Sequence, residues 1–231
     1  METSITFLEL CQRTARESGV IQGTKPSTVI GQVGTLAQLV EWVADAWVEI
    51  QTEEKWPWLR TDFSKNTVAS IGSYSPTAWS LTGHGEWITE PQSTSLYLTS
   101  TGVSDESWLS HIPYTDYQLL YRIGTQTDAR PVHWSISPTG NFLLGPEPDA
   151  VYTVHGEYYK SPQVLATNSD TPTGLPVEFE NIIVYKAVQR FGEFDEAANA
   201  IALAAQKYTQ MLNRMRRRLM PVFESPGGWV M

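Results

Sequence analysis

The sequence contains a single cysteine, Cys11, so it cannot form an internal disulfide and can offer at most one thiolate to a metal. No window approaches the roughly 20 consecutive apolar residues that a membrane-spanning helix requires. The first ten residues, METSITFLEL, carry an acid where a secretory signal would have a basic region and an apolar stretch. We therefore expect synthesis in a reducing cytosol and no membrane partner.

Basic residues are also scarce. Lys and Arg number 16 against 25 Asp and Glu, which gives a formal net charge of −9. General nucleic-acid binding requires a wide basic surface, so this balance argues against it. The remaining composition, 41% hydrophobic and 18% charged, is typical of a globular protein, and the nine Trp and ten Tyr are side chains that often form interfaces.

Motifs of catalysis and cofactor binding are missing. The sequence has no nucleophile elbow, P-loop or dinucleotide-binding fingerprint. Its histidines are not spaced like a metal-binding pair, although GHGE at residues 83–86 has the most site-like surroundings. They are His84, His111, His133 and His155. Cys11 lies on the apolar face of a predicted helix, where a buried role is favoured over a nucleophile. We predict no enzymatic activity and no catalytic, cofactor-binding or metal site.

Helical periodicity marks the N-terminal part of the chain. A first helix is predicted to begin after a cap at Thr3 or Ser4 and to end at Gly19. A second runs from Thr35 until Pro57 stops it. Apolar residues on more than one side of this second helix indicate several neighbours.

The same period returns near the C-terminus. One helix is predicted to start at Pro176, a favourable first position, and to be broken or kinked at Gly192. Asp195 is then expected to cap a long final helix that reaches Leu219. Helices from both ends of the sequence are expected to pack together.

Residues 61–162 follow a different pattern, with short segments rich in Thr, Ser and aromatic residues divided by Gly and Pro. We therefore predict an α+β fold. In it, the N- and C-terminal helices form a bundle, an antiparallel β-domain (a barrel or a sandwich) is inserted, and an extended tail follows. The predicted boundaries are 1–60 and 163–219 for the bundle, 61–162 for the β-domain and 220–231 for the tail.

Tryptophans of the β-domain admit two interpretations. Exposed on a sheet, Trp79, Trp87, Trp108 and Trp134 could stack on sugar rings, as in a glycan-binding module. Alternatively they fill the core of a small sheet, which needs bulky side chains. The second interpretation is favoured.

The densest basic run of the chain, NRMRRR, lies at the predicted end of the last helix. It contains Arg214, Arg216, Arg217 and Arg218. Cations are stabilised at a helix C-terminus by the macrodipole. Three consecutive arginines cannot share one face, so at least one is solvated or reaches a neighbour. A solvated helix end, an acidic partner and direct DNA contact all remain open.

The segment after Leu219 combines residues that prevent folding with apolar ones. Pro221, Pro226, Gly227 and Gly228 oppose helix formation. Apolar side chains that a merely solubilising tail would avoid are Val222, Phe223, Trp229 and Val230. This pattern is typical of a segment that becomes ordered on a partner, although packing back on its own domain is the alternative.

An ordered series of segments resembles head–tail adaptor (connector) proteins of tailed bacteriophages, including the tail tubular protein A type. At the front these segments are FLELCQRTARESGV, PSTVIGQVGTLAQLVEWVADAWVEIQ and WPWLR. At the back they are GEYYKSPQVL, DTPTGLPVEFENIIVYKAVQRFGEF and YTQMLNRMRRR. The resemblance covers nearly the whole chain and is weakest from Asn66 to Ser110.

The resemblance implies a structural virion protein at the head–tail junction, made in the bacterial host cytoplasm. Such adaptors assemble as a ring, a dodecamer, beneath the portal, close the DNA-filled head and provide the attachment site for the tail. The implied partners are the portal protein, further copies of the chain and the next neck or tail protein (nozzle, tail terminator or tail tube). DNA would pass through the acidic lumen during ejection without specific binding, and no cofactor is implied.

Site residues follow from the same resemblance. Residues 219–231 would be the portal anchor, with Arg214, Arg216, Arg217 and Arg218 beside it and Val222, Phe223, Trp229 and Val230 within it. Trp79, Trp87 and Trp108 are candidates for a tail-side or outward interface. The alternative function is an aromatic-rich glycan-binding or tail-associated recognition module.

Overall fold

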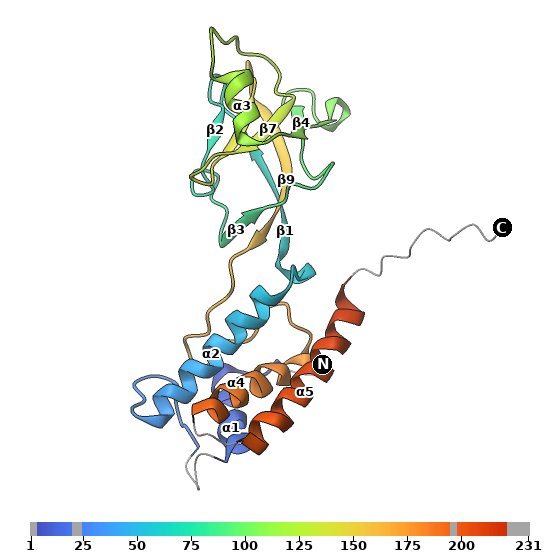
Figure 1. Cartoon of the computed structure of the whole chain (residues 1–231). Helices are drawn as coiled ribbons and strands as arrows, with labels where there is room; N and C mark the ends of the chain where they lie inside the picture. Colours follow the sequence, from blue (N-terminus) through green and yellow to red (C-terminus); the bar gives the residue numbers. More distant parts are fainter. Residues whose placement is uncertain (1–3, 20–24, 195–197, 221–231) are drawn as a thin grey trace, which may run out of the picture. The chain divides into compact units, whose positions relative to one another are not determined.

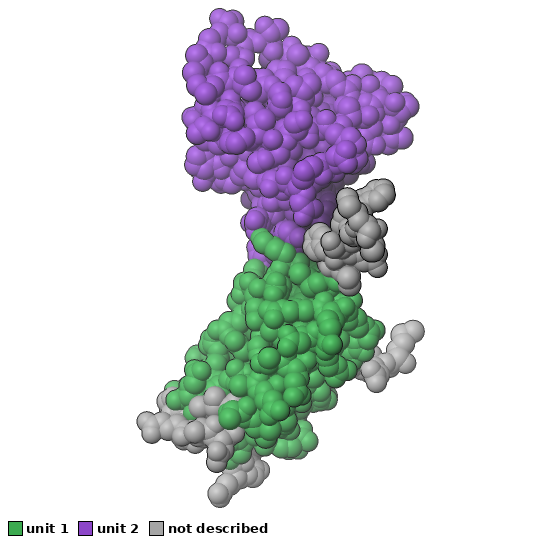
Figure 2. All heavy atoms as spheres, turned by 45° about the vertical axis from the view of Figure 1, so that its right-hand side comes forward, with its two compact units in different colours: residues 1–59, 162–231 green, residues 60–161 purple. Residues whose placement is uncertain are grey.

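The computed structural model describes residues 4–19, 25–194 and 198–220 (Figure 1). The chain divides into two compact units. Unit 1 comprises residues 1–59 and 162–231, and unit 2 comprises residues 60–161, drawn in green and purple in Figure 2. The described regular elements of unit 1 are helices, and unit 2 contains the strands β1 to β9 together with two short helices. The predicted α+β class is confirmed.

Unit 1 is built on the α-helices α1 (Phe7–Ser18), α2 (Thr35–Glu53), α4 (Asn181–Phe194) and α5 (Ala198–Leu219). The short 3-10 helices η1 (Pro57–Leu59) and η3 (Val177–Phe179) precede unit 2 and α4 respectively. Helix α4 packs against α1, α2 and α5 (Figure 1). Leu39, Val43, Trp47 and Ile50 recur every three or four residues along α2 and are fully buried. Helices from the two ends of the sequence therefore share one core.

Helix α1 begins later than predicted. Thr6, not Thr3 or Ser4, is its N-cap, and it forms a capping box with Glu9. The Thr6 side chain accepts from the Glu9 N–H at 3.3 Å, and the Glu9 carboxylate accepts from the Thr6 N–H at 2.9 Å. Gly19 ends the helix with a left-handed φ of 68°, as expected.

The C-terminal helices also differ from the prediction at their ends. Pro176 precedes η3, and α4 starts only at Asn181. Gly192 does not end α4, which continues to Phe194, because a single glycine inside a helix costs only about 1 kcal/mol relative to alanine. The predicted cap Asp195 lies outside the described residues.

Polar side chains join segments of unit 1 that are distant in sequence. Gln51 on α2 and Gln163 form a reciprocal pair, with Gln51 donating to the Gln163 carbonyl at 2.9 Å and accepting from its N–H at 2.8 Å. The fully buried Glu180 carboxylate accepts from the Ile5 N–H at 2.8 Å and from the Ser4 hydroxyl. The Ser4 side chain therefore donates a hydrogen bond to Glu180 and does not cap α1. These bonds satisfy groups that would be costly to bury unpaired.

Unit 2 contains two sheets and no closed barrel. The first has the order β1 (Arg60–Asn66), β9 (Tyr152–Lys160), β4 (Ser95–Leu98) and β5 (Ser107–Trp108), with β3 (His84–Trp87) also paired to β9. The second has the order β2 (Ser73–Tyr74), β8 (Phe142–Gly145), β7 (His133–Ile136) and β6 (Ser110–His111). The strands pair antiparallel, as predicted, except that β6 and β7 pair in parallel. Short helices η2 (Val103–Asp105) and α3 (Tyr114–Tyr121) lie between strands.

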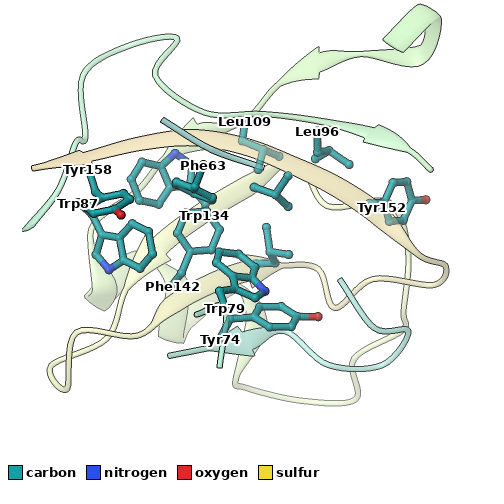
Figure 3. Close-up of a cluster of buried hydrophobic side chains, with 12 residues drawn as sticks. Phe63, Tyr74, Trp79, Trp87, Leu96, Leu109, Trp134, Phe142, Tyr152 and Tyr158 are labelled. Atoms are coloured by element: carbon teal, nitrogen blue, oxygen red, sulfur yellow. The ribbon is translucent and has the colours of Figure 1, made fainter. Parts of the chain in front are cut away.

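The core of unit 2 is aromatic (Figure 3). Trp134 stacks on Phe142 with ring centroids 4.8 Å apart, and Tyr74 stacks on Trp79 at 4.6 Å. Gly156 on β9 lies opposite Phe63 on β1, where a Cβ would approach the Phe63 ring to 2.7 Å. A glycine is required there because the aromatic ring occupies the space of a side chain.

Candidate functional site

The arginines at the end of α5 fall into two pairs. Arg216 is partly buried, and its guanidinium lies 2.7 Å from the Glu54 carboxylate and 3.5 Å from that of Glu53. Arg218 forms an ion pair with Glu178 on η3. Both therefore fasten the last turns of α5 to neighbouring segments of unit 1.

Arg214 and Arg217 form the second pair. They lie three residues apart on the helix, so their side chains share one face, and both are exposed. Arg217 donates from Nε to the Asn213 carbonyl of its own helix at 3.2 Å. Within the part of the chain that the structure describes, neither has an acidic partner. These two cations are available to another molecule directly before residue 221.

Arg216 forms its ion pairs at the end of a row of acidic residues along α2. Asp45, Glu49 and Glu53 are spaced four residues apart and lie on one face of the helix. Arg190 on α4 pairs with Asp45 at 3.0 Å and also with Glu49, and Lys186 pairs with Glu49 at 3.1 Å. We call these residues, with Glu54 and Arg216, the α2 charge ladder. Its ion pairs join α4 and the end of α5 to the C-terminal half of α2 and to Glu54 directly after it.

Tyr208 on α5 belongs to the same surface. Its hydroxyl donates to the Glu53 carboxylate, and Lys186 lies 5.1 Å from the centre of its ring. Burial and the neighbouring Glu53 carboxylate raise the pKa of Tyr208, because both disfavour the phenolate. Tyr208 is therefore a fixed hydrogen-bond donor. The sequence carried a signal for the ladder, since acids and bases recur at four-residue spacing on α2 and α4.

The predicted tail residues Val222, Phe223, Trp229 and Val230 lie outside the described residues. Their proposed docking role stays a prediction. The described chain ends one residue beyond α5, at Met220, whose N–H donates to the Arg216 carbonyl at 2.9 Å.

Three tryptophans of unit 2 were predicted as interface candidates, and the structure separates them. The side chains of Trp79 and Trp87 are 5% and 4% exposed and belong to the core. Trp134, considered for sugar stacking, is buried beside them. The interpretation favoured from the sequence, that these side chains fill the core, is therefore correct for Trp79, Trp87 and Trp134. Trp108 is 58% exposed, so the interface and glycan-binding hypotheses now depend on Trp108.

The histidines do not gather into a site. His84 lies against the rings of Trp87 and Tyr158, at 4.2 and 5.1 Å, and burial lowers its pKa. Among residues 4–19, 25–194 and 198–220, no group of three or more His, Cys, Asp or Glu could hold a metal ion. Nor does any helix in these ranges have the length and apolar character to cross a membrane.

Comparison with protein families gives independent evidence on what the chain is. A family model described as SU10 adaptor protein matches residues 5–227, which include segments of both units. The chain belongs to this family. It is a family of phage head–tail adaptors, so the adaptor is a virion protein and the predicted resemblance is confirmed. No curated protein matches the adaptor.

The α2 charge ladder should make the adaptor sensitive to acid. Burial alone would raise the pKa of Glu49, but hydrogen bonds from Arg190 and Lys186 outweigh burial and hold it below its ordinary value. A depressed pKa contributes stability that is present above the unfolded-state pKa of about 4.5 and is lost as pH falls through the folded-state value. We expect Glu49→Gln to lower the melting temperature at neutral pH and to flatten its decline below about pH 5.

Melting curves of the wild type and of Glu49→Gln between neutral and acidic pH would test this expectation. Glu41→Gln is the matched control, since Glu41 is an exposed acid on the same helix with no ion pair to another described residue. Parallel declines for Glu49→Gln and the wild type would contradict the assigned role of the ladder.

Proposed function

We propose that the adaptor assembles as a homo-oligomeric ring, a dodecamer, beneath the portal, closes the DNA-filled head and provides the attachment site for the tail. The family match over residues 5–227 carries this proposal. The match continues past the end of α5 at Leu219 as far as residue 227, so it includes residues 220–227 of the predicted tail but not Trp229 or Val230.

The C-terminal end of the chain is the proposed portal anchor. Arg214 and Arg217 supply two exposed cations immediately before residues 221–231, whose apolar residues include Phe223 and Trp229. Fully extended, these residues could span roughly 35 Å. A cleft with acidic and apolar groups on the portal would match both features. Ordering the segment there would let it cover a large surface, as in other segments that fold on binding.

The charge of the chain is compatible with a DNA channel. With a formal net charge of −9, the ring would repel the phosphate backbone and let DNA pass without specific binding. On the opposite side of the junction, the next neck or tail protein is the proposed partner. Trp108 on β5 is the exposed aromatic residue proposed for that contact.

Cryo-electron microscopy of the adaptor mixed with the portal of its own phage tests this function. We expect a ring of adaptor subunits stacked on the portal, with density for residues 221–231 in portal clefts. The adaptor without portal serves as the control for rings that form independently. Absence of a stable complex at moderate salt would overturn the proposed function.

A further inference from the structure

A groove on the outer face of the first sheet of unit 2 has no assigned role. It is lined by residues of β1, β9, β4 and β5 and by the segments around them. The strand register explains its composition: Ser64 pairs with His155, His155 with Ser95, and Ser95 with Trp108. Directly paired residues in a sheet point to the same side. One row of side chains therefore crosses four strands and ends at the exposed Trp108.

The neighbouring row is acidic. Asp62 on β1 pairs with Glu157 on β9. Asp62 lies two residues from Ser64 along β1, and Glu157 lies two residues from His155 along β9, so their side chains point to the same face as the first row. Glu106 lies two residues before Trp108 and also lines the groove. The opposite face of these strands carries Phe63, Leu96 and other core residues. The groove is thus a polar, acidic surface above a packed core.

The three carboxylates of the groove differ in their partners. Glu157 is held by Arg60, which also pairs with Glu90 at 3.2 Å. Glu106 accepts from the Ser95 hydroxyl at 2.6 Å and lies 3.9 Å from His155 Nδ1. Asp62 is exposed and has no ion pair with another described residue. Glu106 and Asp62 therefore leave negative charge in the groove without a strong cation to neutralise it.

Trp108 is unusual in this setting because its ring lies at the acidic groove and is mostly exposed. A guanidinium stacks on a Trp ring through its planar face and forms hydrogen bonds with a carboxylate through its edge. An arginine placed over Trp108 could do both, because Glu106 lies on the same face two residues away. An extended peptide places alternate side chains on one side, at a spacing that suits neighbouring positions of a sheet.

We propose that this groove binds an extended, arginine-bearing peptide segment of the next neck or tail protein. The inference rests on the proposed function, because it supplies the chemistry of the tail-side contact. One arginine stacks on Trp108 and pairs with Glu106, and a second cation further along reaches Asp62. Charge complementarity selects this occupant over a neutral oligosaccharide. Trp108 offers one stacking platform, since Trp79, Trp87 and Trp134 are buried.

The test uses the indole N–H signals of the full-length, ¹⁵N-labelled adaptor in two-dimensional NMR. The chain has nine tryptophans, and the signal that disappears in Trp108→Phe identifies Trp108. The probe is a synthetic peptide of alternating serine and arginine, and the control peptide has citrulline in place of arginine. We expect the arginine peptide to shift the Trp108 signal in a saturable and salt-sensitive way, while the core indoles stay in place.

Two variants, each of which removes one acidic charge from the groove, measure how much the carboxylates contribute to peptide affinity. Glu106→Gln and Asp62→Asn should each weaken peptide binding about twofold to fivefold, as expected for exposed ion pairs. Asp116→Asn on α3 is the matched control and should leave binding unchanged, because Asp116 is an exposed acid outside the groove. The Glu106→Gln side chain keeps an oxygen that can accept from Ser95, so this variant removes charge with little change in local structure.

Each contrary outcome has a definite meaning. No shift of the Trp108 signal, or equal binding of the citrulline peptide, would overturn the inference. A shift with maltoheptaose or chitohexaose and none with the arginine peptide would replace it with glycan binding.

Portal binding by the same variants is a separate readout. If portal binding is intact while the peptide fails to bind, the groove inference fails and the proposed function stands. Lack of portal binding by the wild type would count against the proposed function instead.

Discussion

Removal of residues 220–231 should abolish binding of the adaptor to the portal and leave its fold intact. The described core of unit 1 is formed by α1, α2, α4 and α5, and each of these helices ends at or before Leu219. The deleted segment contains Phe223 and Trp229, the apolar residues proposed to enter the portal. Losing both anchors and the order they acquire on the partner should reduce affinity by several orders of magnitude.

Co-sedimentation of the truncated adaptor with the portal would measure this loss, and circular dichroism with a melting curve would verify the fold. A full-length chain in which residues 220–231 are replaced by a Gly/Ser segment of equal length is the control for chain length. Unchanged association of the truncated chain would disprove the anchor. A large drop in melting temperature would instead indicate that the segment packs on unit 1.

The arginines allow a finer version of the same experiment. Arg214→Ala with Arg217→Ala should weaken portal binding at unchanged stability, because both side chains are exposed and lack described acidic partners. Arg216→Ala should instead lower the stability of the adaptor and leave portal binding unchanged. The loss of stability should be about 1 kcal/mol or less, since the ion pairs of Arg216 with Glu53 and Glu54 are partly exposed. If the double variant and Arg216→Ala weakened portal binding equally, the exposed arginines would have no special role in binding the portal.

The helices could be predicted from the sequence because their signals are local. The apolar period of α2 and the Gly19 stop of α1 require no knowledge of distant residues. The cap of α1 was missed although Thr6 and Glu9 have capping-box spacing, a signal equally visible in the sequence. Ser4 looked like a cap because its true partner, Glu180, is distant in sequence.

Unit 2 was harder to predict for a physical reason. Its strands β2, β5 and β6 each have two residues, which is too few to show alternation. The inward orientation of Trp79 and Trp87 and the parallel pairing of β6 with β7 are set by long-range packing. The groove has the same origin, since it depends on the register of four strands. The row of acidic residues along α2, by contrast, could have been recognised from residue spacing.

Substitution of Trp134 should separate the stabilities of the two units. Its ring is buried and stacked on Phe142, so Trp134→Ala should destabilise unit 2 by about 3–5 kcal/mol. Each unit has its own buried core, and the core of unit 2 consists of residues from within 60–161. We therefore expect faster amide hydrogen exchange throughout β7, β8 and β9 and unchanged exchange in α2 and α4.

Trp108→Ala is the matched control, because it makes the same replacement in the same unit at an exposed position. It should change stability by no more than about 0.5 kcal/mol.

Trp47→Ala, in the core of unit 1, should produce the reverse pattern, with faster exchange in α2 and α4 and unchanged exchange in β9. Hydrogen exchange measured by mass spectrometry resolves these segments. If Trp134→Ala accelerated exchange equally in both units, they would unfold as one cooperative structure. Independent responses would mean that unit 2 can change with the tail partner while the helical core keeps its structure.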